Sequence, residues 1–292
     1  MTTHHHIPIR AVFCAVTAAL MFATMGAAVR YSSQFLTNEM VVFLRNIFGF
    51  LFLLPWLHKK GFRNLGTKRP KTHLLRSLSG LTAMYCFFYA IANLQLAEAV
   101  LLNYASPIFI AVIALVWLGE KASPKLIAAV LLGFIGICFI LKPGIGILQA
   151  AAWVGLLSAV FAALAMVTIR NLSATEPITR IVFYYCLICS VVSAFPAIWA
   201  WQTPPLGVLL VMGFAGLVAT TGQMLLTYSY SLAPAARVGP YTYAAVIFAA
   251  IYGWIIWSER PDLFSAIGAV LVIIAGIMAL QRKKFPRMTQ PV

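Results

Sequence analysis

The stretch YASPIFIAVIALVWLGE, residues 104–120, recurs in the second half of the chain as YAAVIFAAIYGWIIWSE, residues 243–259. At this offset of 139 residues, identical residues meet at six positions of the stretch. The matched pairs include Tyr104 with Tyr243, Glu120 with Glu259, Tyr89 with Tyr228 upstream and, at an offset of 140, Arg30 with Arg170. Because the matches keep one order along the chain, the sequence predicts two copies of a single unit.

The composition places both copies in a membrane. Of the 292 residues, 62% are hydrophobic and only 9% are charged, whereas soluble domains carry about 25% charged residues. A helix needs about 20 mostly apolar residues to cross a bilayer, so this length allows on the order of ten crossings joined by short loops. No room is left for a soluble domain.

Ten apolar stretches meet this requirement, five in each copy. The spans are expected at residues 11–29, 40–57, 77–94, 99–118, 126–141, 152–169, 181–200, 207–228, 238–257 and 263–281. An odd number of crossings makes the second copy enter the membrane from the opposite side. The predicted fold class is therefore an all-α membrane protein with ten transmembrane helices in two inverted five-helix repeats. The predicted units are a tail at 1–9, repeats at 10–142 and 150–281, and a basic tail at 282–292.

The basic residues set the expected orientation. The chain carries 21 Lys and Arg against 6 acidic residues, a net charge of +15. Arg30, Lys142 and Arg260 fall on one side of the predicted membrane, Arg45 falls within a span, and the others, Arg76 included, fall on the side of the N-terminus. The positive-inside rule then predicts cytoplasmic N- and C-termini in a bacterial inner membrane. This distribution indicates that the basic residues contact membrane lipids and do not bind nucleic acid.

Four motifs carry a resemblance to a known superfamily. They are FLRN at 43–46, AEAVLLNYASPIF at 97–109, LGE at 118–120 and WSERP at 257–261. With them the chain resembles the drug/metabolite transporter superfamily from about Ala11 to Gln281, in particular its ten-helix members with two EamA-type repeats. The resemblance implies a secondary transporter without a cofactor. The block at 88–109 is most similar to a subgroup that includes S-adenosylmethionine carriers, whereas LMFATM at 20–25 stands where many relatives have a tryptophan.

An enzyme is not expected. All five histidines lie outside the predicted spans, and the only aspartate, Asp262, lies in a loop. Catalysis inside the membrane would need acids, bases or nucleophiles at helical spacing. The five cysteines fall within spans, and Cys186 and Cys189 form a CxxC with no further Cys or His nearby. We therefore expect neither a disulfide nor a metal site.

Polar side chains on the faces of the third, fourth, eighth and ninth spans mark a candidate substrate site. The expected contacts are Tyr85, Tyr89, Asn103, Tyr104, Ser106, Gln223, Thr227, Tyr228 and Tyr243. Their similar positions in the two halves predict a tyrosine-rich cavity between these spans. The alternative is that the Tyr and Ser hydroxyls bond between packed helices. Pro107 predicts either a broken helix or a simple kink.

Arg45 is an arginine inside an apolar stretch, where it costs roughly 2.5 to 3.5 kcal/mol. On the predicted topology it lies near the outer surface, where the fourth span begins with Glu98. One hypothesis is that Arg45 and Glu98 form a gating pair at the external mouth, with Asn46 satisfying the remaining donors. The alternative is that Arg45 reaches out to lipid headgroups or helix carbonyls.

These patterns predict transport of a small organic metabolite by alternating access. Proton-coupled export of a cation would need a carboxylate at the midplane, and the sequence offers only Glu98, at the mouth. A neutral, zwitterionic or anionic substrate, amino-acid-like or similar to a nucleoside or S-adenosylmethionine, is therefore favoured. The alternative function is a non-transporting membrane scaffold or sensor on the same fold. Both a monomer and a homodimer are compatible with the sequence.

Overall fold

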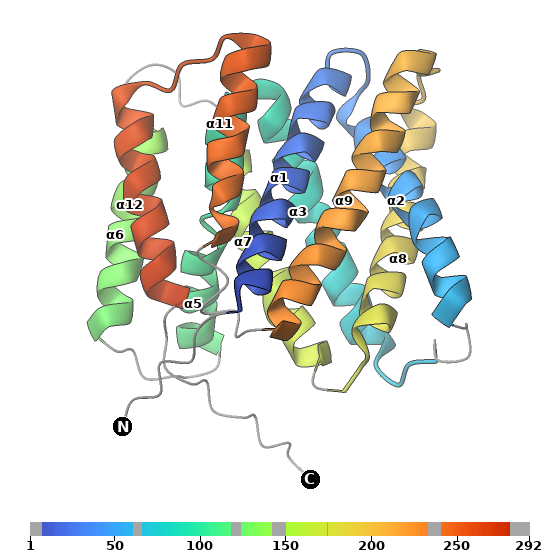
Figure 1. Cartoon of the computed structure of the whole chain (residues 1–292), viewed down its shortest axis with the longest axis horizontal. Coiled ribbons are helices and arrows are strands. Elements are labelled where there is room, and N and C mark those ends of the chain that lie inside the picture. The colour runs from blue at the N-terminus through green and yellow to red at the C-terminus, as the bar shows by residue number, and fades with distance from the viewer. Residues whose placement is uncertain are drawn as a thin grey trace.

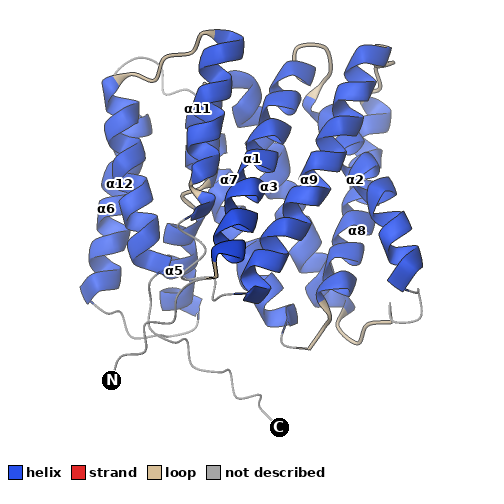
Figure 2. Cartoon of the chain, in the orientation of Figure 1, coloured by secondary structure: helices blue, strands red, loops and turns tan. Residues whose placement is uncertain are grey.

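The computed structural model describes residues 8–60, 66–117, 124–141, 150–173, 175–232 and 241–280, and every regular element among them is a helix (Figure 2). The helices are α1 (Ile9–Ser32), α2 (Asn38–Lys60), α3 (Pro70–Asn93), α4 (Leu96–Asn103), α5 (Ser106–Trp117), α6 (Pro124–Leu141), α7 (Ala150–Ser173), α8 (Ile178–Trp199), α9 (Leu206–Leu232), α11 (Ala244–Trp257) and α12 (Leu263–Leu280). Six stretches are long and apolar enough to cross a membrane, in α1, α2, α3, α7, α8 and α9. Four shorter apolar helices run over Leu96–Ile110, Ile127–Ile140, Ala244–Trp257 and Leu263–Met278.

The helices stand side by side and alternate in direction (Figure 1). We call the end at which α1 begins and α12 ends the proximal end, and the opposite end the distal end. At the proximal end, Ser229 Oγ near the end of α9 donates to the carbonyl of Ala11 at the start of α1 over 2.5 Å. Along the bundle, α6 and α12 pack together, while α2, α8 and α9 lie in contact on the opposite side of the molecule.

The packing partners keep the symmetry of the repeat. Helix α1 packs along α9, and α7, which is the counterpart of α1 in the second half, packs along α3, the counterpart of α9. Helices α2 and α8 are counterparts that contact each other, and so are α6 and α12. Exchanging the halves therefore returns these main helix contacts, with each helix reversed in direction. The predicted fold class of two inverted five-helix repeats is confirmed.

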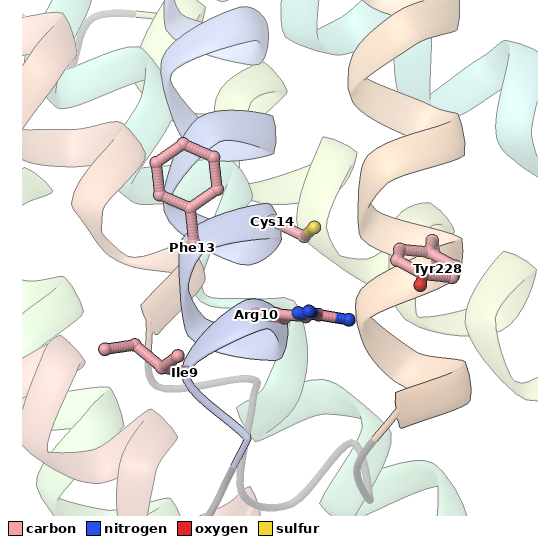
Figure 3. Close-up of a pocket in the computed structure, with 5 residues that line it drawn as sticks. All are labelled: Ile9, Arg10, Phe13, Cys14 and Tyr228. Atoms are coloured by element: carbon pink, nitrogen blue, oxygen red, sulfur yellow. The ribbon is translucent and has the colours of Figure 1, made fainter.

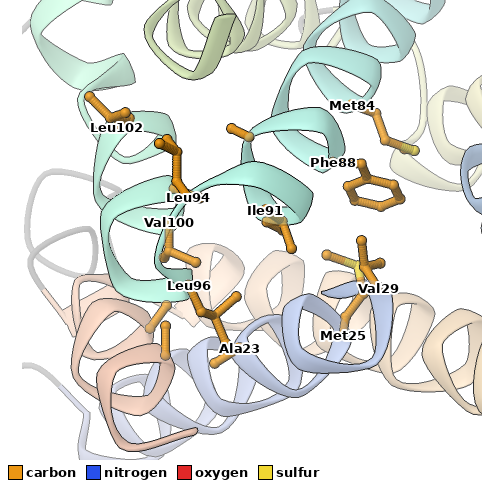
Figure 4. Close-up of a cluster of buried hydrophobic side chains, with 14 of the residues drawn as sticks. Ala23, Met25, Val29, Met84, Phe88, Ile91, Leu94, Leu96, Val100 and Leu102 are labelled. Carbon is orange, nitrogen blue, oxygen red and sulfur yellow. The ribbon is translucent and has the colours of Figure 1, made fainter. Parts of the chain in front are cut away.

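Small residues let the helices approach closely, which matters in lipid because apolar surface alone gives no preference for helix contact. Helix α1 buries Ala11, Ala15 and Ala18 completely. A Cβ at Gly216 of α9 would lie 2.9 Å from the backbone nitrogen of Gly49 in α2, so the backbones of these two helices are in direct contact. Toward the distal end, side chains of α1 and α3 interlock, with Val29 facing Phe88 (Figure 4).

Helix α3 starts seven residues earlier than the expected span at 77–94. Its first residue is Pro70, and proline favours the first helical turn because its fixed φ suits the helix and its missing N–H is not needed there. As a result His73 and Arg76 belong to the helix and are buried, with 1% and 8% of their surface exposed. The helix thus extends beyond the predicted span, and both side chains are packed inside the bundle, whereas the sequence analysis placed them in a connection.

The fourth span is a broken helix and not a kinked one. Helix α4 ends at Asn103, Tyr104 and Ala105 form a turn, and α5 begins at Ser106. Pro107 has no N–H, and its ring would clash with the carbonyl of Asn103 in a continuous helix. The chain breaks at the corresponding place in the second half, where Tyr243 forms a turn ahead of α11.

Candidate functional site

The two helix breaks face each other inside the bundle. The ring centroids of Tyr104 and Tyr243 lie 5.8 Å apart, and the hydroxyl of Tyr243 donates to the carbonyl of Tyr104 over 3.2 Å. In an unbroken helix that carbonyl would accept from the N–H of Ile108, which here donates to Ala105 over 3.0 Å instead. The break therefore frees an acceptor for the other half of the molecule.

Tyr243 is fixed from its far side by α12. It is 4% exposed, and its hydroxyl lies where a Cβ of Gly276 would otherwise stand. Glycine at position 276 thus leaves the space that the phenol ring occupies. The Tyr104–Tyr243 pair is the point at which broken helices of both halves and α12 meet.

Other predicted residues of the fourth span tie it to its neighbours. Asn103 Nδ2 donates to Ser158 Oγ of α7 over 3.0 Å, and this hydroxyl donates in turn to the carbonyl of Gly155 over 2.6 Å. Ser158 is fully buried and Ser106 is 9% exposed. In this structure Asn103 therefore forms a hydrogen bond between packed helices, which is the alternative to substrate contact given in the sequence analysis.

The remaining predicted contacts spread over the bundle. The hydroxyl of Tyr85 is buried without a hydrogen-bond partner, whereas Tyr89 is 39% exposed. Gln223 is half-buried on α9, and the side chain of Thr227 lies outside the described residues. Tyr228 lies at the proximal end of α9.

Tyr228 lines a groove between α1 and α9. The groove has a volume of about 340 Å³ and is lined by Ile9, Arg10, Phe13, Cys14 and Tyr228 (Figure 3). The structure therefore brings Tyr104 and Tyr243 together and places Tyr228 in a separate apolar groove.

Arg45 and Glu98 have different partners in this structure. Arg45 Nη1 donates to Asn46 Oδ1 over 3.0 Å, whereas Glu98 Oε1 accepts from Ser265 Oγ of α12 over 2.5 Å. Both residues belong to the described part of the chain, and they form no ion pair with each other there. The gating pair stays a prediction, which exchange of the two charges would test.

An ion pair that the sequence analysis missed closes the distal end. Arg30 at the end of α1 pairs with Glu259, just beyond α11, and their side chains are 18% and 10% exposed. Glu259 Oε2 also accepts from the backbone N–H of Leu96 over 2.9 Å, and the guanidinium of Arg30 lies 5.0 Å from the ring centroid of Trp257. Arg30 further donates to the carbonyl of Leu94. One cluster thus joins α1, α11 and the connection between α3 and α4.

The backbone beyond α11 aims Glu259 back at the bundle. Ser258 has a φ of 55°, the left-handed conformation that commonly ends a helix, and the N–H of Glu259 bonds to the carbonyl of Gly253 over 3.0 Å. The repeat itself held the signal for this pair, since Arg30 and Glu259 both lie at matched positions.

A second charged cluster joins the α2–α3 and α7–α8 connections at the proximal end. Glu176 is 7% exposed and accepts from Thr67 Oγ1 over 2.7 Å and from Arg180 Nη1 over 2.5 Å. His73 Nε2 lies 3.9 Å from the same carboxylate. Burial would raise the pKa of Glu176, but the hydrogen bonds from Thr67 and Arg180 outweigh it and hold the pKa below its ordinary value.

Two inverted repeats, a helix break in each half and buried polar residues between the halves define a transporter of small molecules in a membrane. The chain belongs to the EamA-like transporter family, whose profile matches residues 9–142 and 149–281. The suspected relationship to the drug/metabolite transporters is confirmed. A crystal structure of another protein matches with a TM-score of 0.65 at 20% identity, over 92% of this chain and 96% of that chain, and this likeness shows the fold alone.

Relatives of this chain are transporters named for different substrates. The pseudopaline exporter CntI of Pseudomonas aeruginosa is 35% identical over 94% of this chain and 96% of its own length. The S-adenosylmethionine uptake transporter of Rickettsia bellii is 26% identical over 87% of this chain and 88% of its own. The riboflavin transporter of Vibrio cholerae is 27% identical, with 98% of both chains covered. These relatives and the family imply that the chain is a transporter and not an enzyme.

Proposed function

We propose that this chain is a secondary transporter of the bacterial inner membrane that exports a small organic metabolite by alternating access, with its proximal end in the cytoplasm. The observation that carries the proposal is the contact between Tyr104 and Tyr243. Each of these residues interrupts a membrane helix, and the two interruptions meet between inverted halves. In transporters built from inverted repeats, broken helices near the midplane line the substrate site.

The charged clusters support a two-ended mechanism. Arg30 and Glu259 hold the distal end together through contacts that a rocking motion of the halves would have to break. Thr67, Glu176 and Arg180 form a separate cluster at the proximal end. Both clusters are formed in this structure, and alternating access would release first one and then the other as the substrate crosses.

The relatives support the direction and the kind of substrate. The exporter shares 35% identity with this chain, whereas the uptake transporter shares 26%. We therefore assign export of an amino-acid-like or nucleoside-like metabolite.

Transport can be tested with the purified chain in proteoliposomes. Counterflow of labelled S-adenosylmethionine and labelled riboflavin gives two defined probes, and metabolite profiles of the culture medium give an unbiased one. We expect at least one solute to be enriched outside cells that express the wild type. Tyr243→Phe should lower this enrichment several-fold while its membrane abundance stays near normal.

Tyr31→Phe is the matched control, because Tyr31 is an exposed tyrosine at the distal end of α1. It should transport like the wild type. A proportional loss of abundance and activity in Tyr243→Phe would assign that residue to packing alone. Absence of both counterflow and enrichment would favour the scaffold or sensor alternative.

A further inference from the structure

Arg76 points away from the nearer aqueous surface. It lies six residues into α3, about 9 Å along the helix axis from its proximal start. Its guanidinium extends one turn further toward the membrane centre, because Nη1 lies where a Cβ of Gly80 would collide with it. An arginine that merely avoided the lipid would extend the other way, toward the proximal headgroups. Headgroup contact therefore does not explain its position.

The guanidinium is held in place by α8. It lies over the ring of Tyr185, 4.1 Å from the centroid, in a cation–π arrangement. Arg76 is 8% exposed, and its Nε and Nη1 atoms are buried without a hydrogen-bond partner. The structure thus fixes a cation inside the bundle and leaves its donors free.

Arg45 reaches the same turn of α8 from α2. Helix α2 packs antiparallel along α8, where the ring centroids of Phe50 and Phe183 lie 6.2 Å apart. Arg45 lies five residues before Phe50, which places it at the level of the turn of α8 that begins at Tyr185. Arg45 Nε and Asn46 Nδ2 are also buried without a partner. The cluster therefore offers several unpartnered donors from α2 and α3 beside one turn of α8.

Neither arginine forms an ion pair with a carboxylate in the described part of the chain. Burying one unpaired charge in a membrane is costly, and two of like sign add mutual repulsion. Such an arrangement is compensated when an anion binds between the cations. Guanidinium groups suit carboxylates in particular, because their donors match the two carboxylate oxygens.

We infer that Arg45 and Arg76, between α2, α3 and α8, bind a carboxylate group of the transported metabolite. The inference rests on the proposed transport function and narrows the substrate to organic anions and zwitterions. Gly80 is part of the site, because a Cβ there would collide with Nη1 of Arg76 and would displace the guanidinium from its present position.

The test is a thermal-shift titration of the purified full chain with glutarate, in neutral detergent at constant ionic strength. A ligand that binds only the folded state raises its apparent stability. Glutarate should raise the melting temperature of the wild type, and the uncharged glutaramide should not. Arg76→Met and Arg45→Met should each weaken glutarate binding by about ten- to a hundredfold, which corresponds to the loss of a charge-assisted hydrogen bond.

Two further variants keep the test informative if a methionine variant folds poorly. Arg76→Lys retains the charge and loses the planar donor pair, so it should bind glutarate with intermediate affinity. Gly80→Ala retains both arginines and displaces the guanidinium, so it should also weaken binding. The matched control is Arg260→Met, which removes an exposed arginine outside the cluster and should respond like the wild type.

Three outcomes would overturn the inference. They are an equal shift with glutaramide, an unchanged shift in all four cluster variants, and stabilisation by phosphatidylglycerol but not by glutarate. The last would assign the arginines to a lipid phosphate. A glutarate response without transport of any solute would retain the site and refute the transport function, whereas transport without that response would refute the site alone.

Discussion

Gly276 sets the position of Tyr243. In an exposed helix, alanine in place of glycine gains up to about 1 kcal/mol. Here the new methyl group would occupy the space of the phenol hydroxyl, and overpacking of this kind costs about 1–3 kcal/mol. We therefore expect Gly276→Ala to displace the ring, break its bond to Tyr104 and lower transport.

Gly207→Ala is the matched control for this change, since a Cβ at Gly207 meets no atom within 4 Å. Melting temperature and counterflow of both variants give the measurement. Equal behaviour of the two variants would show that the contact between α12 and Tyr243 is unimportant.

At single residues, sequence patterns predict Tyr104 and Tyr243 as candidate site residues and do not predict Arg76. Tyr104 and Tyr243 were predicted because the repeat matches them, and the structure brings them together. The sequence pattern places Arg76 on the side of the N-terminus, just before the span at 77–94, whereas in the structure Pro70 starts the helix earlier and Gly80 leaves space for the guanidinium. Periodicity in the sequence does not carry that information.

Among the connections between helices, the Arg30–Glu259 pair makes a specific prediction about closure of the distal end. Removing one partner of a buried ion pair costs about 3–5 kcal/mol, because the other charge is left without compensation. Arg30→Met and Glu259→Gln should each open the distal end. Exchange of both residues, Arg30→Glu with Glu259→Arg, should partly restore closure.

Labelling of a cysteine introduced at Ala99 by a thiol reagent measures this opening, in a chain whose five native cysteines are replaced by serine. Ala99 is fully buried, so labelling of the otherwise wild-type chain should be slow. Arg260→Met, beside the pair but exposed, is the control. Labelling that stays slow in both single variants would refute a closing role for the pair.

The proximal cluster predicts a pH-dependent contribution to stability. Because the folded-state pKa of Glu176 lies below its ordinary value of 4.5, the carboxylate stabilises the fold above that value, and this contribution is lost as the pH falls through the folded pKa. Glu176→Gln should lower the melting temperature at pH 7. A hydrogen bond to a charged group contributes about 1.5–3 kcal/mol.

The difference between wild type and Glu176→Gln should shrink below about pH 4.5. His73 also faces Glu176 and titrates, so a His73→Gln background separates the two groups. A difference that stays constant from pH 7 to the lowest pH tolerated would contradict the assignment.

Over the whole molecule, the inverted topology predicts the sides on which two loops lie. Lys68 lies at the proximal end and Gln202 at the distal end, and both are exposed. A cysteine at Lys68 should react with an impermeant thiol reagent only when the cytoplasmic face is accessible, and one at Gln202 only from outside. Reaction of both from one side would contradict the topology.

The number of spans, their direction and the repeat were predictable because hydropathy and duplication are properties of the chain itself. Which helices pack against each other could not be predicted from the sequence. Contacts such as α1 with α9 and α6 with α12 depend on where small residues on two distant helices coincide, as at Gly136 and Gly268. No single helix reveals its partner in its own sequence.

The position of Tyr104 and Tyr243 has an energetic consequence. Exchanging the halves converts this ring pair into itself, so it lies on the pseudo-twofold axis, whereas Arg30 and Glu259 have no such relation to each other. In an inverted repeat the inward-open and outward-open states exchange the roles of the two halves, so we expect the ring contact to add a similar free energy to each state. Weakening the Tyr104–Tyr243 contact should therefore leave the population ratio of the two states unchanged and alter only the barrier between them. Weakening an off-axis contact such as Arg30–Glu259 should shift the population ratio itself.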